Sequence, residues 1–173
     1  LIEPVGTLGA DVVLNGDFEE TGADQVLNGD FSQEGSEEVV NGDFSNGGAD
    51  WTLTNFSVIN GKAVINSNAE GYLIQSSVTE IGKTYRVEFT ISDYVEGRLR
   101  LREPFINNDL ESNPSNGTYV YYGVADSTSF QIQSRFSGED YSYSIDNVSV
   151  VEVGQNWGLG TGWNIGDDKA VAS

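Results

Sequence analysis

The residues best suited to recognise a ligand alternate along three short stretches. They are Arg98, Arg100 and Arg102; Gln131, Gln133 and Arg135; and Tyr119 and Tyr121, with Tyr122 beside them. Aromatic rings stack on the C–H face of a sugar, while planar amide and guanidinium groups bind hydroxyls through paired hydrogen bonds. If the three stretches are neighbouring strands of one sheet, they would form a polar, aromatic-edged surface that binds an acidic glycan or an acidic patch of a partner.

The same arginines have a structural interpretation. Arginine on an exposed strand discourages pairing with another sheet edge, and it can form ion pairs across strands with Glu88 and Glu96. The sequence leaves both interpretations open.

The charge of the chain excludes several kinds of partner. Its formal net charge is −19, and residues 1–50 hold 12 of the 27 acidic residues and none of the 8 lysines and arginines. Binding to nucleic-acid phosphates or to anionic membranes is therefore not expected. No apolar run approaches the roughly 20 residues needed to cross a bilayer.

The residue types that are missing bear on catalysis. The chain has no Cys and no His, which removes thiol catalysis, serine–histidine catalysis and zinc sites built on these ligands. Two carboxylates could hydrolyse a glycoside without histidine, but no acidic pair stands out among so many. We predict that the protein is not an enzyme.

Period-two alternation predicts an all-β protein. The clearest stretch is Tyr141–Val153, where a bulge at Asp146-Asn147 would let Ile145 and Val148 share one face. Further strands are expected over 51–57, 62–66, 72–76, 83–92, 96–102, 118–122 and 127–136. We predict an antiparallel β-sandwich, specifically a jelly roll, over residues 39–153.

Residues 1–38 form an acidic arm with an internal repeat. Asn-Gly-Asp-Phe begins at positions 15, 28 and 41, a spacing of 13 residues. Units this short cannot bury a core alone. They would pack against neighbouring chains, as in a trimeric fibre stalk, or form a loosely ordered arm that duplicates the first strand. The first alternative predicts a homo-oligomer.

Residues 154–173 read as the start of a further β module. Trp163 followed by Lys169-Ala-Val repeats the order of Trp51 and Lys62-Ala-Val. We therefore place Trp51 and Trp163 at equivalent positions, where core packing is the expected role of both.

Three motifs resemble a known family. Asn41-Gly-Asp-Phe-Ser with Trp51, Gly82-Lys-Thr-Tyr-Arg-Val-Glu-Phe89 and Ile145-Asp-Asn-Val-Ser-Val150 are similar, in this order, to motifs of jelly-roll carbohydrate-binding modules. The resemblance covers about residues 38–153. Gly117-Thr-Tyr119 also resembles the variant of these modules found in phage virion and fibre proteins.

The resemblance implies a structural calcium ion between the opening and closing strands. Carried over from the family, its carboxylate ligands here would be Asp43 and Asp146, with Asn46 or nearby carbonyls assisting. Calcium prefers six to eight oxygen ligands, which this oxygen-rich end could provide. The glutamate that follows the phenylalanine in the family is Ser45 in this chain. The competing interpretation is that Asp43 only hydrogen-bonds its own turn.

Two functions follow as hypotheses. The first is a non-catalytic carbohydrate-binding module in a virion fibre or another extracellular adhesive assembly. The second is a purely structural virion or filament component whose repeats mediate assembly. The partners would be a glycan or other subunits, and the location the virion surface or the extracellular space.

Overall fold

The protein is built from strands alone in the part of the chain that the structure describes. The structure is a computed structural model that describes residues 26–105, 114–135, 139–158, 160–166 and 169–172. The strands are β1 (Glu34–Glu37), β2 (Thr52–Thr54), β3 (Phe56–Ile59), β4 (Lys62–Ser67), β5 (Tyr72–Gln75), β6 (Thr84–Glu96), β7 (Leu99–Glu103), β8 (Gly117–Val124), β9 (Phe130–Ser134), β10 (Tyr141–Val153), β11 (Trp163–Gly166) and β12 (Lys169–Ala172). These ranges contain no helix that is long and apolar enough to span a membrane.

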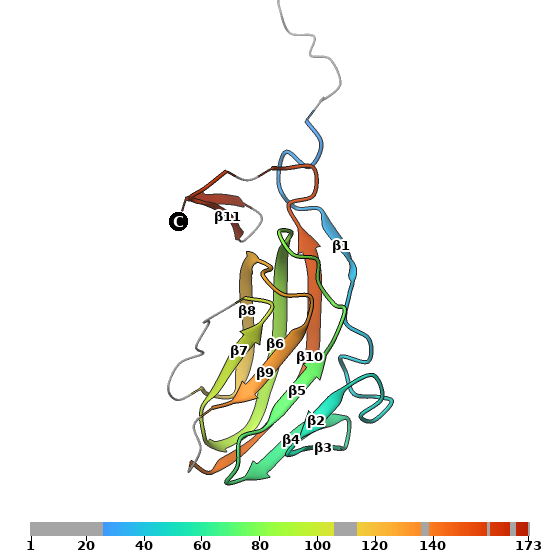
Figure 1. Cartoon of the computed structure of the whole chain (residues 1–173), viewed down its shortest axis with the longest axis vertical. Helices are drawn as coiled ribbons and strands as arrows, with labels where there is room; N and C mark the ends of the chain where they lie inside the picture. Colours follow the sequence, from blue (N-terminus) through green and yellow to red (C-terminus); the bar gives the residue numbers. More distant parts are fainter. Residues whose placement is uncertain (1–25, 106–113, 136–138, 159, 167–168, 173) are drawn as a thin grey trace, which may run out of the picture.

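Two antiparallel sheets face each other and form the predicted sandwich (Figure 1). The first has the order β3-β4-β10-β6-β8, and β1 adds to β10 at its side. The second has the order β2-β5-β9-β7. We call them the long sheet and the short sheet. A separate hairpin, β11–β12, follows β10.

The core lies between the two sheets because each strand turns every second residue inward. In β6, Val87, Phe89 and Ile91 are at most 1% exposed, and they alternate with half-buried polar residues. The short sheet contributes apolar residues such as Leu101 and Ile132 to the same cluster. Ile145 and Val148 of β10 also belong to it, which confirms that one core connects the closing strand with β6.

The expected bulge in β10 is confirmed. Asp146 lies opposite Thr90 and Ser149 opposite Glu88, so β10 contains one residue more than β6 between these pairs. Asn147 absorbs the irregularity with a φ of 50°, a left-handed conformation that Asn tolerates better than most residues. The bulge keeps both halves of β10 facing the core.

One predicted strand is in fact two. The stretch 51–57 divides into β2 in the short sheet and β3 in the long sheet. Asn55 separates them with a φ of 56°, and its side-chain amide donates a 2.7 Å hydrogen bond to the Glu70 carbonyl. Leu53 therefore packs from one sheet and Phe56 from the other, which alternation alone did not indicate.

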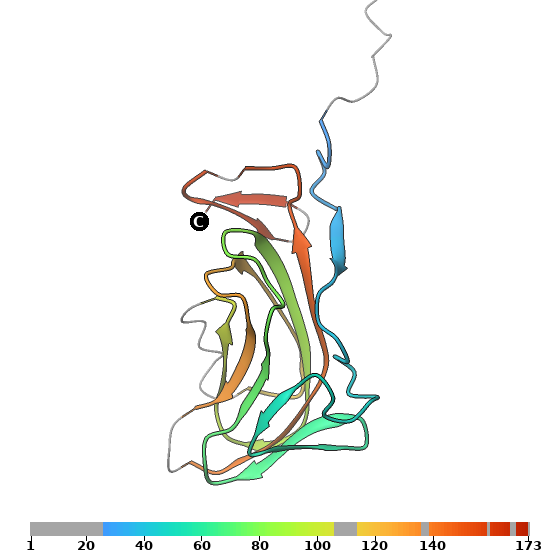
Figure 2. The same cartoon turned by 45° about the vertical axis from the view of Figure 1, so that its right-hand side comes forward.

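The segments on either side of the sandwich lie at the same end of it. β1 runs along β10, and the β11–β12 hairpin lies beyond the end of β10, near the described start of the arm (Figures 1 and 2). Of the three repeats, the one beginning at residue 15 lies outside the described residues. Core packing, the role expected of both Trp51 and Trp163, is confirmed for Trp51, which is 8% exposed, and is wrong for Trp163, which is 52% exposed.

Candidate functional site

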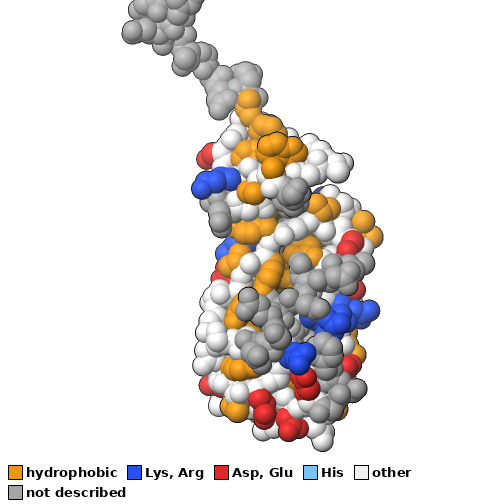
Figure 3. Space-filling model, turned by 90° about the vertical axis from the view of Figure 1, so that its left-hand side faces the viewer, with side chains coloured by type: hydrophobic (Ala, Val, Ile, Leu, Met, Phe, Trp, Pro, Cys, Tyr) orange, Lys and Arg blue, Asp and Glu red, His pale blue; other side chains and the backbone are white. Residues whose placement is uncertain are grey.

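The outer face of the short sheet carries the largest group of predicted ligand residues. Across its four strands, Thr54, Tyr72, Gln133 and Arg100 lie opposite one another in turn. They face away from the core, because Leu53, Leu73, Ile132 and their neighbours on alternate positions face inward. Figure 3 views the molecule from the side of β7 and β8 and shows Lys and Arg side chains gathered at mid-height.

Gln133 is at the centre of a complete hydrogen-bond network on this face. It is 6% exposed. Its Oε1 accepts from Arg100 Nε at 2.9 Å and from Arg100 Nη2 at 2.6 Å. Its Nε2 donates to the Tyr72 hydroxyl at 3.1 Å and to Glu70 Oε2 at 3.3 Å, and the Tyr72 hydroxyl also donates to Glu70. This half of the face is therefore fixed in one geometry before any ligand arrives.

Gln131 has the same burial and the same orientation but not the same partners. It is also 6% exposed, and the one hydrogen bond that its Oε1 accepts from the described residues is a long bond of 3.5 Å from Arg102. Its Nε2 is buried and has no hydrogen-bond partner among the described residues. Leaving such a donor unpaired costs about 1–3 kcal/mol, so buried polar groups are rarely found in this state.

A second unsatisfied atom belongs to the residue paired with Gln131. Glu103 lies opposite Gln131 in the β7–β9 ladder, and its Oε2 is buried with no partner in the described part of the chain. One atom is an N–H donor and the other is a carboxyl acceptor. A hydroxyl group that reached both atoms would satisfy them, since it accepts one hydrogen bond and donates another. Because both atoms are buried, the side chains that cover them have to move for a ligand hydroxyl to enter.

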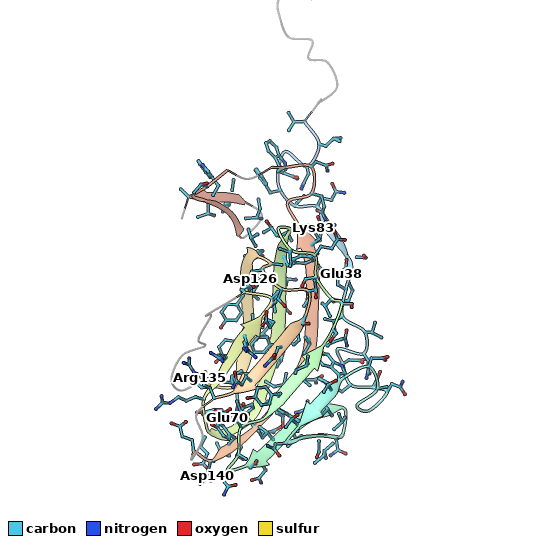
Figure 4. All side chains as sticks on the ribbon, in the orientation of Figure 1. Glu38, Glu70, Lys83, Asp126, Arg135 and Asp140 are labelled. Atoms are coloured by element: carbon cyan, nitrogen blue, oxygen red, sulfur yellow. The ribbon has the colours of Figure 1, made fainter. Side chains whose placement is uncertain are left out.

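The acid–base state of the network suits the binding of hydroxyl groups. Burial, and then the hydrogen bond to the Glu70 carboxylate, raise the pKa of Tyr72 above its usual value. Tyr72 therefore keeps its proton and remains a hydrogen-bond donor at neutral pH. In Figure 4, Glu70 and Arg135 are labelled at the same end of the sandwich. The face thus combines arginines with carboxylates and is not uniformly basic.

The expectation that β8 belongs to this face is wrong. β8 pairs with β6 in the long sheet, where Tyr119 lies opposite Phe89 and Tyr121 opposite Val87. This register turns both tyrosines inward, and their rings stack on Phe89 with centroids 5.8 and 6.2 Å apart. Tyr122 points to the other side of β8 and packs near Val151 and Val153.

The remaining predicted arginines lie at the border of the face. Arg98 forms a 3.2 Å ion pair with Glu139, and the backbone N–H of Arg135 donates to the Arg98 carbonyl. β7 is an edge strand of the short sheet, so the structural interpretation of its arginines also has a physical basis. The expected pairs with Glu88 and Glu96 involve the long sheet, where Glu88 instead pairs with Arg86.

Sequence reasoning missed three residues of the face: Glu70, Tyr72 and Glu103. Tyr72 alternates with the inward Leu73, a signal that the sequence contains. Glu70 lies just before β5 and not within a strand. Glu103 reaches the face only because the β7–β9 register shifts after Leu101. No local pattern indicates either of these two.

The predicted calcium ligands occupy a turn that is stabilised by its own hydrogen bonds. Asp43 Oδ1 accepts from the Ser45 backbone N–H at 3.1 Å and from the Ser45 hydroxyl at 2.9 Å. These bonds hold the pKa of Asp43 below its usual value. Asp146 accepts from the Asn147 N–H. The described residues contain no group of three or more acidic side chains placed for a metal, so calcium at Asp43, Asn46 and Asp146 stays a prediction.

Comparison with known proteins yields a weak likeness to solved structures. No protein-family model matches the chain, and a comparison with curated proteins gave no match. Among solved structures, the chain is similar to a "Mannan Binding Module from Man5C", with 14% sequence identity and a TM-score of 0.43. The match covers 61% of this chain and 93% of that one. A likeness at this level is too weak to identify a ligand.

Proposed function

We propose that the protein is a non-catalytic carbohydrate-binding module whose ligand face is the outer surface of the short sheet. The observation that carries the proposal is the pair of unsatisfied buried atoms, Gln131 Nε2 and Glu103 Oε2, beside a preformed network. Sugars present many hydroxyls, each of which can act as donor and acceptor at once. Polar groups that are fixed in advance lose little conformational entropy when the ligand binds.

The charges on this face favour an uncharged sugar over the acidic glycan expected from the arginines. Arg100 already donates two hydrogen bonds to Gln133. A ligand carboxylate near Gln131 would face Glu103, and the like charges would repel each other. A neutral hydroxyl avoids this repulsion and satisfies both atoms.

The proposal also includes where the protein acts and what it assembles with. The resemblance to modules of phage virion and fibre proteins supports a place on a virion or another extracellular surface, in an assembly of several chains. The alternative, a purely structural component, is favoured by the position of the arginine-bearing β7 at a sheet edge. Size-exclusion chromatography with light scattering on the full chain would test whether it is a homo-oligomer.

Titration with sugars, observed by NMR on the ¹⁵N-labelled chain, tests the ligand face. The panel contains neutral oligosaccharides and oligomers of uronic acids. We expect neutral ligands to shift the side-chain amide signals of Gln131 and Gln133. Gln131→Leu should weaken binding at least tenfold, and Glu103→Gln should weaken the neutral ligands while it improves the acidic ones.

The matched control is Thr90→Ala. Thr90 lies on the long sheet, and its hydroxyl is hydrogen-bonded to that of Thr118. Its removal should leave sugar binding unchanged. Absence of binding by every sugar at millimolar concentration, or equal binding by Gln131→Leu and the unaltered chain, would leave the structural alternative.

A further inference from the structure

The opening turn of the sandwich is held by a tryptophan ten residues later. Asn41 and Phe44 have φ angles of 56° and 50°, and the Phe44 N–H donates to the Asn41 carbonyl at 3.2 Å. The indole N–H of Trp51 donates to the same Asn41 carbonyl at 3.0 Å. The rings of Phe44 and Trp51 pack with centroids 5.3 Å apart. We call the Asn41–Phe44 turn with Trp51 the inner clasp.

The same arrangement occurs a second time, between segments 129 residues apart. Asn28 and Phe31 have φ angles of 52° and 57°, and the Phe31 N–H donates to the Asn28 carbonyl at 3.1 Å. The Trp157 indole donates to this carbonyl at 2.8 Å, and the Phe31 and Trp157 rings lie 5.0 Å apart. We call the Asn28–Phe31 turn with Trp157 the outer clasp.

The details around the two clasps also correspond. The Asn28 side chain accepts from the Gln33 N–H at 2.9 Å, as the Asn41 side chain accepts from the Asn46 N–H at 3.0 Å. The backbone N–H of Trp51, Trp157 and also Trp163 donates at 3.2 Å to a glycine carbonyl three residues earlier, so only the indole bond and the ring contact distinguish Trp157 from Trp163. A hairpin follows the tryptophan of each clasp, β3–β4 in one case and β11–β12 in the other. Trp157, and not Trp163, is therefore the counterpart of Trp51.

The clasps differ in what covers the glycine of the turn. The inner turn packs against the closing strand: the Val148 N–H donates to the Gly42 carbonyl at 2.9 Å, and a Cβ on Gly42 would collide with the Val148 carbonyl oxygen. Among the described residues, the three atoms nearest to a Cβ on Gly29 all belong to Val26, at 3.4 Å or more. Val26, Asn28, Gly29 and Asp30 line an open hollow at this point.

We propose that the outer clasp is the opening of a second sandwich module, into which residues 39–153 are inserted, and that the open side of Gly29 binds the closing strand of that module. The strand has the chemistry of β10: it alternates apolar and polar residues, and one of its N–H groups donates to the Gly29 carbonyl. In the inserted module, β4 pairs with the closing strand β10. The counterpart of β4 in the second module is β12, and no described strand pairs with the outer edge of β12.

Insertion has a consequence for display of the ligand face. Residues 26–38 and the described residues 154–158, 160–166 and 169–172 lie at one end of the sandwich (Figures 1 and 2). The inserted module would thus be joined to the second module at one end only, and the connecting segments would not cover the outer face of its short sheet.

Exchange of the tryptophan indole protons, measured by NMR on the full chain, tests the outer clasp. We expect the Trp51 and Trp157 indole protons to exchange at least tenfold more slowly than that of Trp163. Phe31→Ala should accelerate exchange at Trp157 alone and leave the main unfolding transition unchanged. Phe44→Ala, at a site 1% exposed, should lower that transition. Fast exchange at Trp157, or equal destabilisation by both variants, would overturn the proposal.

A peptide with the sequence of residues 141–153 tests whether a closing strand binds at the open side of Gly29. Added to the ¹⁵N-labelled full chain, it should shift the Gly29 amide signal, and a peptide of scrambled order should not. The neighbouring Asp30 amide signal should shift with that of Gly29, and Gly29→Val should abolish the shift at Asp30 and leave slow exchange at Trp157. Absence of any shift at Gly29 with millimolar peptide would overturn the proposal that a strand binds there.

Discussion

Replacing Gln131 and Gln133 by leucine should change stability in opposite directions. Both side chains are 6% exposed and belong to the same face of the same strand. In Gln131→Leu a buried, unpaired N–H disappears, which should stabilise the fold by about 1 kcal/mol or more. In Gln133→Leu the guanidinium of Arg100 loses its acceptor and Glu70 loses a donor. Loss of such charge-assisted bonds should destabilise the fold by about 2 kcal/mol or more.

Thermal and urea unfolding of the two variants and the unaltered chain measure this difference. A separation of about 3 kcal/mol corresponds to ~6–12 °C in Tm for a chain of this size. Burial, strand and substitution are the same at both sites, so they cancel in the comparison. Equal destabilisation by both substitutions would refute the reasoning, because it would show that the Gln131 amide is satisfied within the fold and does not wait for a ligand.

Two further predictions concern the fold itself. Gly71→Ala should destabilise the fold by about 1–3 kcal/mol, because the new methyl group would lie 2.6 Å from Ile65 Cδ1 and 2.8 Å from Ser134 Oγ. A Cβ on Gly158 would have nothing within 4 Å, so Gly158→Ala should leave stability nearly unchanged. Urea unfolding of both variants measures the difference. Burial raises the pKa of Tyr141 from its ordinary value near 10 to about 12. The folded state therefore keeps this proton when the unfolded chain has lost it, so stability is complete below pH 10 and falls by up to about 2–3 kcal/mol as the pH rises to 12. Urea midpoints across this range should fall less in Tyr141→Phe, and an equal fall in both chains would contradict the assignment.

The sandwich was predictable from the sequence because its strands bury one face and expose the other. Alternation of this kind is visible wherever a strand is long, and β10 matches its predicted range at both ends. The bulge at Asn147 was predictable for the same reason, since the alternation fails there and resumes afterwards. Short strands carry less information, and β2 and β3 were therefore read as one.

The composition of the ligand face was only partly predictable. Alternation places Arg100 and Gln133 outward, but it does not say which sheet a strand joins or which of two alternating sets is buried. In β8 one set contains Tyr119 and Tyr121 and the other contains Tyr122 with two valines, so the pattern is ambiguous. The register against Phe89 decides that Tyr119 and Tyr121 turn inward. Pairing between distant strands determined the outcome, and no local signal encodes it.

Trp157 shows a different limit. The spacing of Trp163 from Lys169-Ala-Val was the basis for comparing it with Trp51, but the turn that recognises the tryptophan lies 129 residues away. The partner of a repeated motif can thus lie on the other side of a whole module in the sequence. Sequence comparison within the repeat could not reveal this partner, because the repeat and the tryptophan are adjacent only in space.

A single irregularity in β7 explains why two equivalent glutamines differ. With regular pairing, Arg102 would lie opposite Gln131 as Arg100 lies opposite Gln133, and both amides would have the same arginine contact. The register instead shifts after Leu101, so Glu103 takes the place opposite Gln131. The Arg102 contact lengthens to 3.5 Å, and the Gln131 Nε2 and Glu103 Oε2 atoms remain unpaired. Bulges re-aim side chains in this way beside functional sites. The shift leaves the polar ladder open at this pair, which is where the proposed ligand hydroxyl would bind.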